Sequence, residues 1–426
     1  MAGRILKTIF VLLLILPLIG SGSASDAGWI GFRGDLGNTG YDGSDLRDPG
    51  KENISLLWEF RSDSAISTSM ISGGNWVLFG TENGTIYRLN SISGALEWKT
   101  GIGSTIRATP LYIDHLGDVI VCDSSGKVTA LSIEDGIQLW RYDTGSEIVS
   151  SPNGEGLVHF GSYDSSFYTL HENGSLAWRY TGCEGWIHTT PAVNEGKVYF
   201  GSCDGFLRCL DAEDGAPLWN FSAAYIPSSP AVHDGNVYFG SYDSNLYCLD
   251  TENGELIWNT TLGGDVQSSP AVDTGPEGNR VVVGCNDGLL YCLDGSDGEI
   301  IWKLDLGPGP LETSPVISKD IVLATYSQGL VMVDLEDGGI FGSFEYGDSR
   351  DVSPSVQCGL VFFGDDDGYV RCLRQEDLQT IDDDTYEIGR EKEFGRDLII
   401  LITGCATVLV IGILFFRRYR KMREES

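Results

Sequence analysis

Residues 226–258 read IPSSPAVHDGNVYFGSYDSNLYCLDTENGELIW, and this stretch decides the fold. A polar-to-Pro turn ending at Pro230 opens a short strand, and further runs rich in β-branched and aromatic residues begin at Asn236, Leu246 and Leu256. The runs are separated by turns built from Gly, Asn and Asp. Four short strands joined by such turns form an antiparallel meander.

The same order of features recurs along most of the chain, with a Trp every 38 to 44 residues. The matching residues are Trp58, Trp98, Trp140, Trp178, Trp219, Trp258 and Trp302, and Phe344 is expected in the next slot. We count eight units, which begin at Ile66, Arg107, Val149, His188, Ile226, Gln267, Glu312 and Val352. A period of about 41 residues with four strands per unit is typical of propeller blades.

Each unit is apolar on both of its faces, as the run Val237, Tyr238 and Phe239 shows. A sheet with one face in water would instead alternate apolar and polar residues. The neighbouring unit is the available cover, so the units stack radially. We therefore predict an all-β fold, an eight-bladed β-propeller of four-stranded antiparallel blades, over residues 53–374.

The last unit lacks a strand of its own. It supplies strands from Val352, Leu360 and Tyr369, whereas residues 55–60 carry Trp58 with no preceding strands. We expect this N-terminal strand to complete the final blade and close the ring noncovalently. An acidic tether is expected at 375–397.

The two ends predict a cellular address. Residues 1–25 resemble a secretory signal peptide, with an uncleaved anchor as the alternative, and 26–52 form a lead-in segment. Leu398 to Phe416 contains no charged side chain and is long enough to cross a bilayer as a helix. The basic tail 417–426 follows and is expected to remain cytoplasmic. The sequence thus predicts a single-pass protein of the cell membrane with its propeller outside.

The charge balance limits the choice of partner. The chain has 28 basic and 61 acidic residues, a formal net charge of −33. Nucleic acid is excluded as the main partner, because binding phosphates requires clustered Lys and Arg. The acidic surface is interpreted as an aid to solubility, with dedicated cation binding as the alternative. The Asn-x-Ser/Thr sequons at Asn53, Asn83, Asn173, Asn220 and Asn259 are compatible with export.

The cysteines recur in the repeat. Cys209, Cys248, Cys292 and Cys372 occupy one slot of the third strand, which favours small buried hydrophobes over disulfides. A bridge between Cys203 and Cys209 is the alternative, and a two-residue turn at 204–205 would place Cys203 opposite Phe206 instead.

No constellation of residues predicts catalysis or metal binding. Asp164, Asp204, Asp243, Asp287 and Asp367 recur in the turn between second and third strands, where Asp bonds nearby backbone N–H groups. The run 365–367 lacks the alternate-residue spacing of a Ca²⁺ loop. The His residues at 115, 159, 171, 188 and 233 show no ligand spacing, and the tripeptide at 33–35 is interpreted as a chance integrin-type match. We predict no catalytic residues and no metal ligands, and no cofactor-binding residue is identified.

The phrases LDAEDGAPLW, LDTENGELIW and LDGSDGEIIW resemble the repeats of the pyrroloquinoline quinone (PQQ) propeller family, and WIGFRGDLGNTGY at 29–41 resembles the lead-in of exported members. The resemblance implies that the Trp of one blade docks against the next. One branch of the family consists of dehydrogenases that bind PQQ and Ca²⁺. A second branch, typified by eight-bladed outer-membrane assembly lipoproteins, binds no quinone and docks proteins.

The dehydrogenase branch fits this sequence less well. No two Cys are adjacent, so the vicinal disulfide of some alcohol-oxidising members is absent, and no long insertion interrupts the repeat. We expect a nonenzymatic scaffold that binds a protein or glycan partner at a propeller face, with no cofactor. The alternative is a membrane-tethered PQQ- and Ca²⁺-dependent dehydrogenase that oxidises alcohols or sugars.

Overall fold

A computed structural model describes residues 28–43, 54–275, 279–345 and 352–375. The predicted signal peptide, tether, membrane helix and basic tail, together with the sequon at Asn53, lie outside the described residues. Within these ranges no helix combines the length and the hydropathy that a membrane crossing requires.

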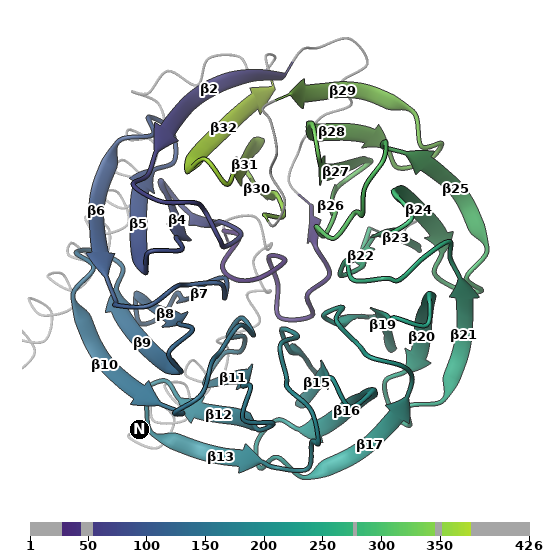
Figure 1. Cartoon of the computed structure of the whole chain (residues 1–426), viewed down its shortest axis with the longest axis horizontal. Coiled ribbons are helices and arrows are strands. Elements are labelled where there is room, and N and C mark those ends of the chain that lie inside the picture. Colours follow the sequence, from purple (N-terminus) through teal and green to yellow (C-terminus); the bar gives the residue numbers. More distant parts are fainter. Residues whose placement is uncertain (1–27, 44–53, 276–278, 346–351, 376–426) are drawn as a thin grey trace, which may run out of the picture. The chain divides into compact units, whose positions relative to one another are not determined.

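The described residues form eight sheets arranged around a centre (Figure 1). The first three sheets contain β3 (Ile71–Gly73), β4 (Trp76–Gly80), β5 (Thr85–Asn90) and β6 (Leu96–Gly101); β7 (Leu111–Ile113), β8 (Asp118–Cys122), β9 (Lys127–Ser132) and β10 (Gln138–Asp143); and β11 (Leu157–Gly161), β12 (Phe167–His171) and β13 (Leu176–Tyr180). The next three contain β14 (Ala192–Asn194), β15 (Lys197–Gly201), β16 (Phe206–Asp211) and β17 (Pro217–Ser222); β18 (Ala231–His233), β19 (Asn236–Gly240), β20 (Asn245–Asp250) and β21 (Leu256–Thr261); and β22 (Ala271–Val272), β23 (Arg280–Gly284), β24 (Leu289–Asp294) and β25 (Ile300–Asp305). The last two contain β26 (Val316–Ser318), β27 (Ile321–Tyr326), β28 (Gly329–Asp334) and β29 (Ile340–Glu345), joined by β1 (Tyr41–Asp42); and β30 (Ser355–Gln357), β31 (Leu360–Gly364) and β32 (Tyr369–Gln375), joined by β2 (Ile54–Arg61).

The predicted eight-bladed propeller is confirmed, with two local differences. In the third blade an isolated bridge between Asn153 and His159 takes the place of the innermost strand. In the seventh blade β1 pairs in parallel with β26, on the inner side of the sheet.

The predicted closure of the ring is also confirmed. Strand β2 pairs antiparallel with β32, and its Trp58 lies opposite Cys372. The first regular strand of the ring and the last therefore belong to one blade (Figure 1). Because the ring is closed in this way, β32 is paired on both sides and β2 forms the outer edge of the blade, as the fourth strand does in the other blades.

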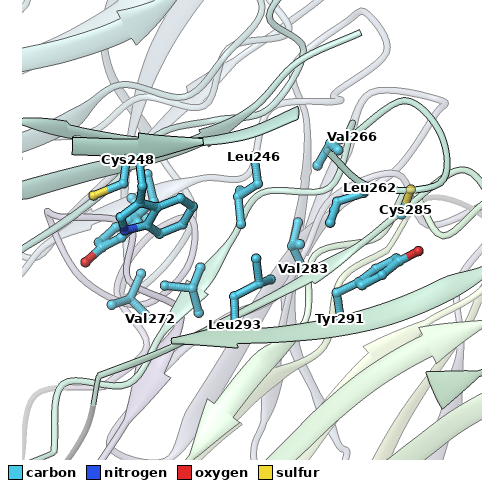
Figure 2. Close-up of a cluster of buried hydrophobic side chains, with 13 residues drawn as sticks. Leu246, Cys248, Leu262, Val266, Val272, Val283, Cys285, Tyr291 and Leu293 are labelled. Atoms are coloured by element: carbon cyan, nitrogen blue, oxygen red, sulfur yellow. The ribbon is translucent and has the colours of Figure 1, made fainter. Parts of the chain in front are cut away.

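Adjacent blades bury each other's faces, as the repeat pattern predicts. Figure 2 shows one such layer, in which Leu246 and Cys248 of the fifth blade lie among Val272, Val283 and Leu293 of the sixth. Each of these side chains is at most 1% exposed. Burial of this apolar surface stabilises the contact between consecutive units by about 25 cal/mol for each Å² removed from water.

Tryptophan docking fixes the spacing of the blades. The Nε1–H of Trp219 in the fourth blade donates to the carbonyl of Thr251 in the fifth, at 3.0 Å. Its ring lies against Gly254, where an added Cβ would be 2.6 Å from Trp219 Cε3. The same pair of contacts is made by Trp58, Trp98, Trp178, Trp258 and Trp302 with the blade that follows each of them.

Trp140 docks on a shorter turn and lacks the hydrogen bond. Its ring lies against Gly174, but its buried Nε1 has no partner among the described residues. Gly174 N bonds to the carbonyl of His171, three residues back, whereas Gly215 N bonds to that of Asp211, four residues back. The turn in the third blade is therefore one residue short, and the acceptor carbonyl is lost.

The expectation for Phe344 is wrong. The residue opposite the third strand in the tryptophan slot of the seventh blade is Gly342, which pairs with Met332. A Cβ on Gly342 would lie 2.1 Å from Met332 Cε, so the methionine occupies the space of the missing side chain. Phe344 instead contacts Phe363 of the eighth blade, with ring centroids 6.0 Å apart.

The lead-in lies in the middle of the ring and bonds to the innermost layer (Figure 1). Its carbonyls accept hydrogen bonds from seven blades: Trp29 O from Ser72 N, Ile30 O from Tyr112 N, Leu36 O from Asn153 Nδ2 and Val193 N, Gly37 O from Val232 N, Thr39 O from Val272 N, and Gly40 O from Ile317 N. These bonds are 2.7–2.9 Å long. Trp29 packs in one apolar cluster with Val356 and Phe363 of the eighth blade, so the segment contacts every blade.

Candidate binding face

A funnel lies at the centre of the ring, with an open volume of about 700 Å³ including its mouth. The segments that lead from the outer strand of one blade to the inner strand of the next line it, and Phe32 of the lead-in borders it. The face that carries these segments is called the funnel face below. The lining consists of Phe32, Ser67, Ser69, Arg107, Thr109, Val149, Ser151, His188, Thr190, Pro227, Ser229, Gln267, Ser269, Glu312, Thr313, Ser314 and Ser353.

A belt of hydroxyl groups encircles the funnel, one from each blade. Its members are Ser69, Thr109, Ser151, Thr190, Ser229, Ser269, Ser314 and Ser353. Five links join neighbouring blades, because the backbone N–H groups of Thr109, Thr190, Ser229, Ser269 and Ser314 each donate to the hydroxyl of the next belt residue. The links Thr190 to Ser229, Ser229 to Ser269 and Ser269 to Ser314 measure 2.9, 3.0 and 3.0 Å. The belt therefore fixes the bore of the funnel and makes its wall polar.

The rim of the funnel, two residues before the belt in each unit, is varied. In the first seven blades these positions hold Ser67, Arg107, Val149, His188, Pro227, Gln267 and Glu312. Two of them are joined directly, because Gln267 Nε2 donates to Glu312 Oε1 at 3.1 Å. The chemical variation among the described lining residues is therefore concentrated at the mouth.

Aromatic side chains gather beside the rim, over the third to fifth blades. Tyr163 and Trp186 stack with centroids 4.9 Å apart and planes 8° from parallel. Tyr225 meets Tyr242 edge to face at 4.6 Å, and its hydroxyl lies 2.6 Å from His188 Nε2. We call Tyr163, Trp186, His188, Tyr225 and Tyr242 the aromatic arc. His188 belongs to both the arc and the funnel rim.

The electrostatics of the rim are nearly balanced. Among the described residues that line the funnel, one carries a guanidinium, Arg107, which pairs with Glu147 at 3.9 Å, and one carries a carboxylate, Glu312. Burial lowers the pKa of His188, so its imidazole is neutral near pH 7.

A second basic group lies beneath the funnel, in the lead-in. Arg33 is 3% exposed, and burial lowers its pKa to about 9 although the nearby Asp35 opposes the shift. Its Nη2 donates to the carbonyl of Pro270 at 3.0 Å and its Nε to that of Asn38 at 3.3 Å. Arg33 is thus a structural residue, and the tripeptide that it begins is not displayed.

Four of the five recurring aspartates have the local role predicted for them, and the bond expected of Asp367 is not observed. Asp164, Asp204, Asp243 and Asp287 each accept from the backbone N–H two residues on, at 3.0–3.2 Å. In the last blade the bond is made by Asp365, which accepts from Tyr369 N and pairs with Arg371. Within the described ranges no group of three or more His, Cys, Asp or Glu side chains is arranged to hold a metal.

The repeated cysteines are not disulfide-bonded and are fully buried, as predicted for Cys209, Cys248, Cys292 and Cys372. The turn predicted after Cys203 is wrong by one residue. Ser202 N bonds to Phe206 O, so three residues form the turn and Cys203 lies within it. Cys203 is half-buried and is not bridged to Cys209.

Neither the belt nor the aromatic arc was predicted from the sequence, although both left a signal. A hydroxyl residue precedes Pro at the same place in several units, as in Thr190-Pro191 and Ser229-Pro230. Trp186 is a tryptophan outside the repeat period. The other two tryptophans outside the repeat period, Trp29 and Trp76, are buried and need no functional explanation.

Comparison with known proteins gives the family. The sequence model of the family described as outer membrane protein assembly factor BamB, built on PQQ-like repeats, matches residues 51–160, 146–229, 204–341 and 274–386. The chain belongs to this family. BamB of Yersinia pestis is 28% identical over 172 residues, which is 36% of this chain and 43% of that protein. The chain thus spans less than half the length of this curated relative.

The family's PQQ-like repeats also occur in enzymes. The 1-butanol dehydrogenase (cytochrome c) of Thauera butanivorans is 28% identical over 163 residues, but these are only 19% of that protein. Among solved structures, BamB from Moraxella catarrhalis superposes with a TM-score of 0.65 at 18% identity, covering 75% of this chain and 99% of that one. Quinohemoprotein alcohol dehydrogenase from Comamonas testosteroni gives 0.70 at 12% identity, covering 83% and 81%. At these identities the structural likeness concerns the fold alone.

Proposed function

We propose that this protein is a nonenzymatic binding scaffold, held at the cell membrane by Leu398 to Phe416, that presents its funnel face to a protein or glycan outside the cell. The observation that carries the proposal is the funnel itself. Every blade contributes one belt hydroxyl, a varied rim surrounds the mouth, and exposed aromatic rings adjoin it. A rigid ring with a varied rim suits recognition better than proton transfer or redox chemistry.

The donor groups in the funnel do not fit the Ca²⁺ and PQQ of the dehydrogenase branch. Calcium takes six to eight oxygen ligands, usually with several carboxylates. Within the part of the funnel that the structure describes, the lining offers one carboxylate, Glu312, and PQQ, itself a polyanion, would meet one guanidinium, that of Arg107. The backbone of the lead-in bonds to the innermost layer of seven blades, which further restricts the central space. These features support a ring without a quinone.

Similarity to assembly factors supports the scaffold as well. The matched family and the Yersinia pestis relative are both described as outer membrane protein assembly factors. For this chain the membrane attachment rests on the sequence, where five basic residues follow the apolar run 398–416.

The proposal is tested with the full chain and a redox dye. Supplied with PQQ, Ca²⁺ and a panel of alcohols and sugars, the protein is expected to reduce no dye and to cause no change in PQQ absorbance. Substrate-dependent dye reduction would instead establish the dehydrogenase. Attachment is tested by washing membranes with alkaline carbonate: the full chain should stay with the membrane, whereas a chain ending before Leu398 should be released.

A further inference from the structure

Trp186 has no structural explanation in the ring. All ten tryptophans lie in the described residues. Seven belong to the docking slots and two, Trp29 and Trp76, are buried, whereas Trp186 is 55% exposed. An exposed indole costs solubility and, when it lies in a patch of aromatic rings, marks a binding surface. The surface around Trp186 is such a patch.

The aromatic arc is held in place before any ligand arrives. Tyr163 stacks on the Trp186 ring, and Trp186 nevertheless remains 55% exposed. The backbone fixes both ends of the arc: Trp186 O accepts from Cys203 N at 2.9 Å, and Tyr242 N donates to Tyr225 O at 3.0 Å. Little side-chain entropy therefore remains to be lost when a flat ligand stacks on it.

The funnel mouth next to the arc is polar and close to neutral. His188 joins the two, because it lines the funnel and its ring lies 5.5 Å from that of Tyr225. Among the described lining residues Arg107 and Glu312 contribute opposite charges, and Arg107 is paired with Glu147 beside the mouth at 3.9 Å, so the funnel offers little positive charge to an anionic ligand. The apolar side chains among the described lining residues are Phe32, Val149 and Pro227, so the funnel wall itself is mainly polar.

One class of ligand fits both the aromatic arc and the funnel rim. A hexopyranose ring has an apolar C–H face that stacks on an aromatic plane, and a rim of hydroxyls that exchange hydrogen bonds with neutral donors and acceptors. We propose that the aromatic arc and the funnel rim bind a neutral hexose oligosaccharide, with Trp186 as the stacking platform and Gln267, Glu312 and His188 as hydrogen-bonding groups. This inference rests on the proposed scaffold function and specifies its partner.

The test uses the full chain in a zwitterionic detergent, since maltoside and glucoside detergents would compete for the site. Maltohexaose, cellohexaose and mannohexaose are titrated up to millimolar concentration, and binding is measured by calorimetry and by tryptophan fluorescence. Because Trp186 is the exposed indole, its emission should respond to a stacked sugar. At least one of the three is expected to bind, and Trp186→Ala should weaken that binding about tenfold.

Two variants control for effects on folding. Trp186→Phe keeps an aromatic plane and should retain most of the affinity. Ile137→Ala removes an exposed apolar side chain from the turn before β10, outside the arc, and should leave affinity unchanged. Failure of all three sugars to bind the folded protein overturns the inference. So does binding that Trp186→Ala does not weaken.

The outcomes separate this inference from the scaffold itself. In one outcome no sugar binds, and the wild type captures a polypeptide that Trp186→Ala does not capture. This result would overturn the proposed glycan ligand but would agree with the proposed scaffold function. Dye reduction with PQQ would overturn the scaffold whatever the sugars do.

Discussion

Gly254 and Gly235 offer a matched pair of substitutions that measures tryptophan docking. Both lie in turns of the fifth blade and both have left-handed backbones, with φ of +71° and +77°. An alanine at either position therefore incurs the same backbone strain, about 1–2 kcal/mol. They differ in what the new Cβ meets. At Gly254 it would lie 2.6 Å from Trp219 Cε3, whereas at Gly235 nothing lies within 4 Å.

The expected costs follow from this difference. Gly235→Ala should lower the free energy of unfolding by the strain alone. Gly254→Ala must also displace the indole from a packed interface, which adds about 1–3 kcal/mol of overpacking. The bond from Trp219 Nε1 to Thr251 O resists that displacement. Gly254→Ala is therefore the costlier change, by about 1–3 kcal/mol.

Urea unfolding of the full chain, followed by circular dichroism, measures both variants under one condition. The m-value should be the same for the two, so that the shift in midpoint reports stability. Adding Trp219→Leu to Gly254→Ala should recover part of the loss, because the smaller side chain makes room for the Cβ. Equal losses for Gly254→Ala and Gly235→Ala would refute the claim that the indole fixes the spacing of the blades.

Three further predictions concern single groups. Burial lowers the pKa of His159 from 6.5 to about 4, so the unfolded chain binds a proton between these values that the folded chain does not. The free energy of unfolding should hence fall by about 3 kcal/mol as pH drops from 6.5 to 4, and His159→Gln should flatten that slope in urea titrations at several pH values. Trp140→Phe should cost about 1 kcal/mol less than Trp219→Phe in the same assay, since Trp140 Nε1 has no hydrogen bond to lose within the described residues; a larger cost for Trp140→Phe would contradict the shortened turn. Under native conditions a thiol reagent should react quickly with the exposed Cys358, and Cys358→Ser should remove one fast-reacting thiol equivalent. Burial raises the pKa of Cys248 to about 12, so Cys248 should not react until the protein unfolds.

Most of the ring could be predicted because its determinants repeat. Eight copies of one pattern reveal strand order, blade number and the slot of Cys248 even where a single copy is ambiguous. The closure by Trp58 was predictable for a related reason, since one unit lacked a strand and the N-terminus carried a spare one. Phe344 was misplaced because aromatic identity was used in place of register, and the bulge after Met332 sets the register.

The site was less predictable, for physical reasons. The lead-in binds through its backbone carbonyls, which every residue possesses, so no side-chain pattern marks its path through the ring. Its few special positions are conformational: Asn38 and Gly40 have φ of +56° and +63°, and a Cβ on Gly40 would lie 2.0 Å from Arg33 Nη2. The arc unites loops from three blades, and its rings meet only once the propeller has closed. Trp186 was visible in the sequence, but its neighbours were not.

The N-terminal part of the chain bonds to residues of the same chain that are synthesised much later. The ribosome makes residues 28–61 early, yet Leu36, Thr39 and Gly40 find their amide donors in units completed hundreds of residues later, and Trp58 must await Cys372. Until the hairpin of β31 and β32 has been synthesised, this stretch contains carbonyl acceptors that lack their amide donors, and its strand β2 lacks its partner β32. The N-terminal segment is therefore synthesised first but completes its contacts last. In a truncated product this segment would stay unpaired and accessible to quality-control proteases.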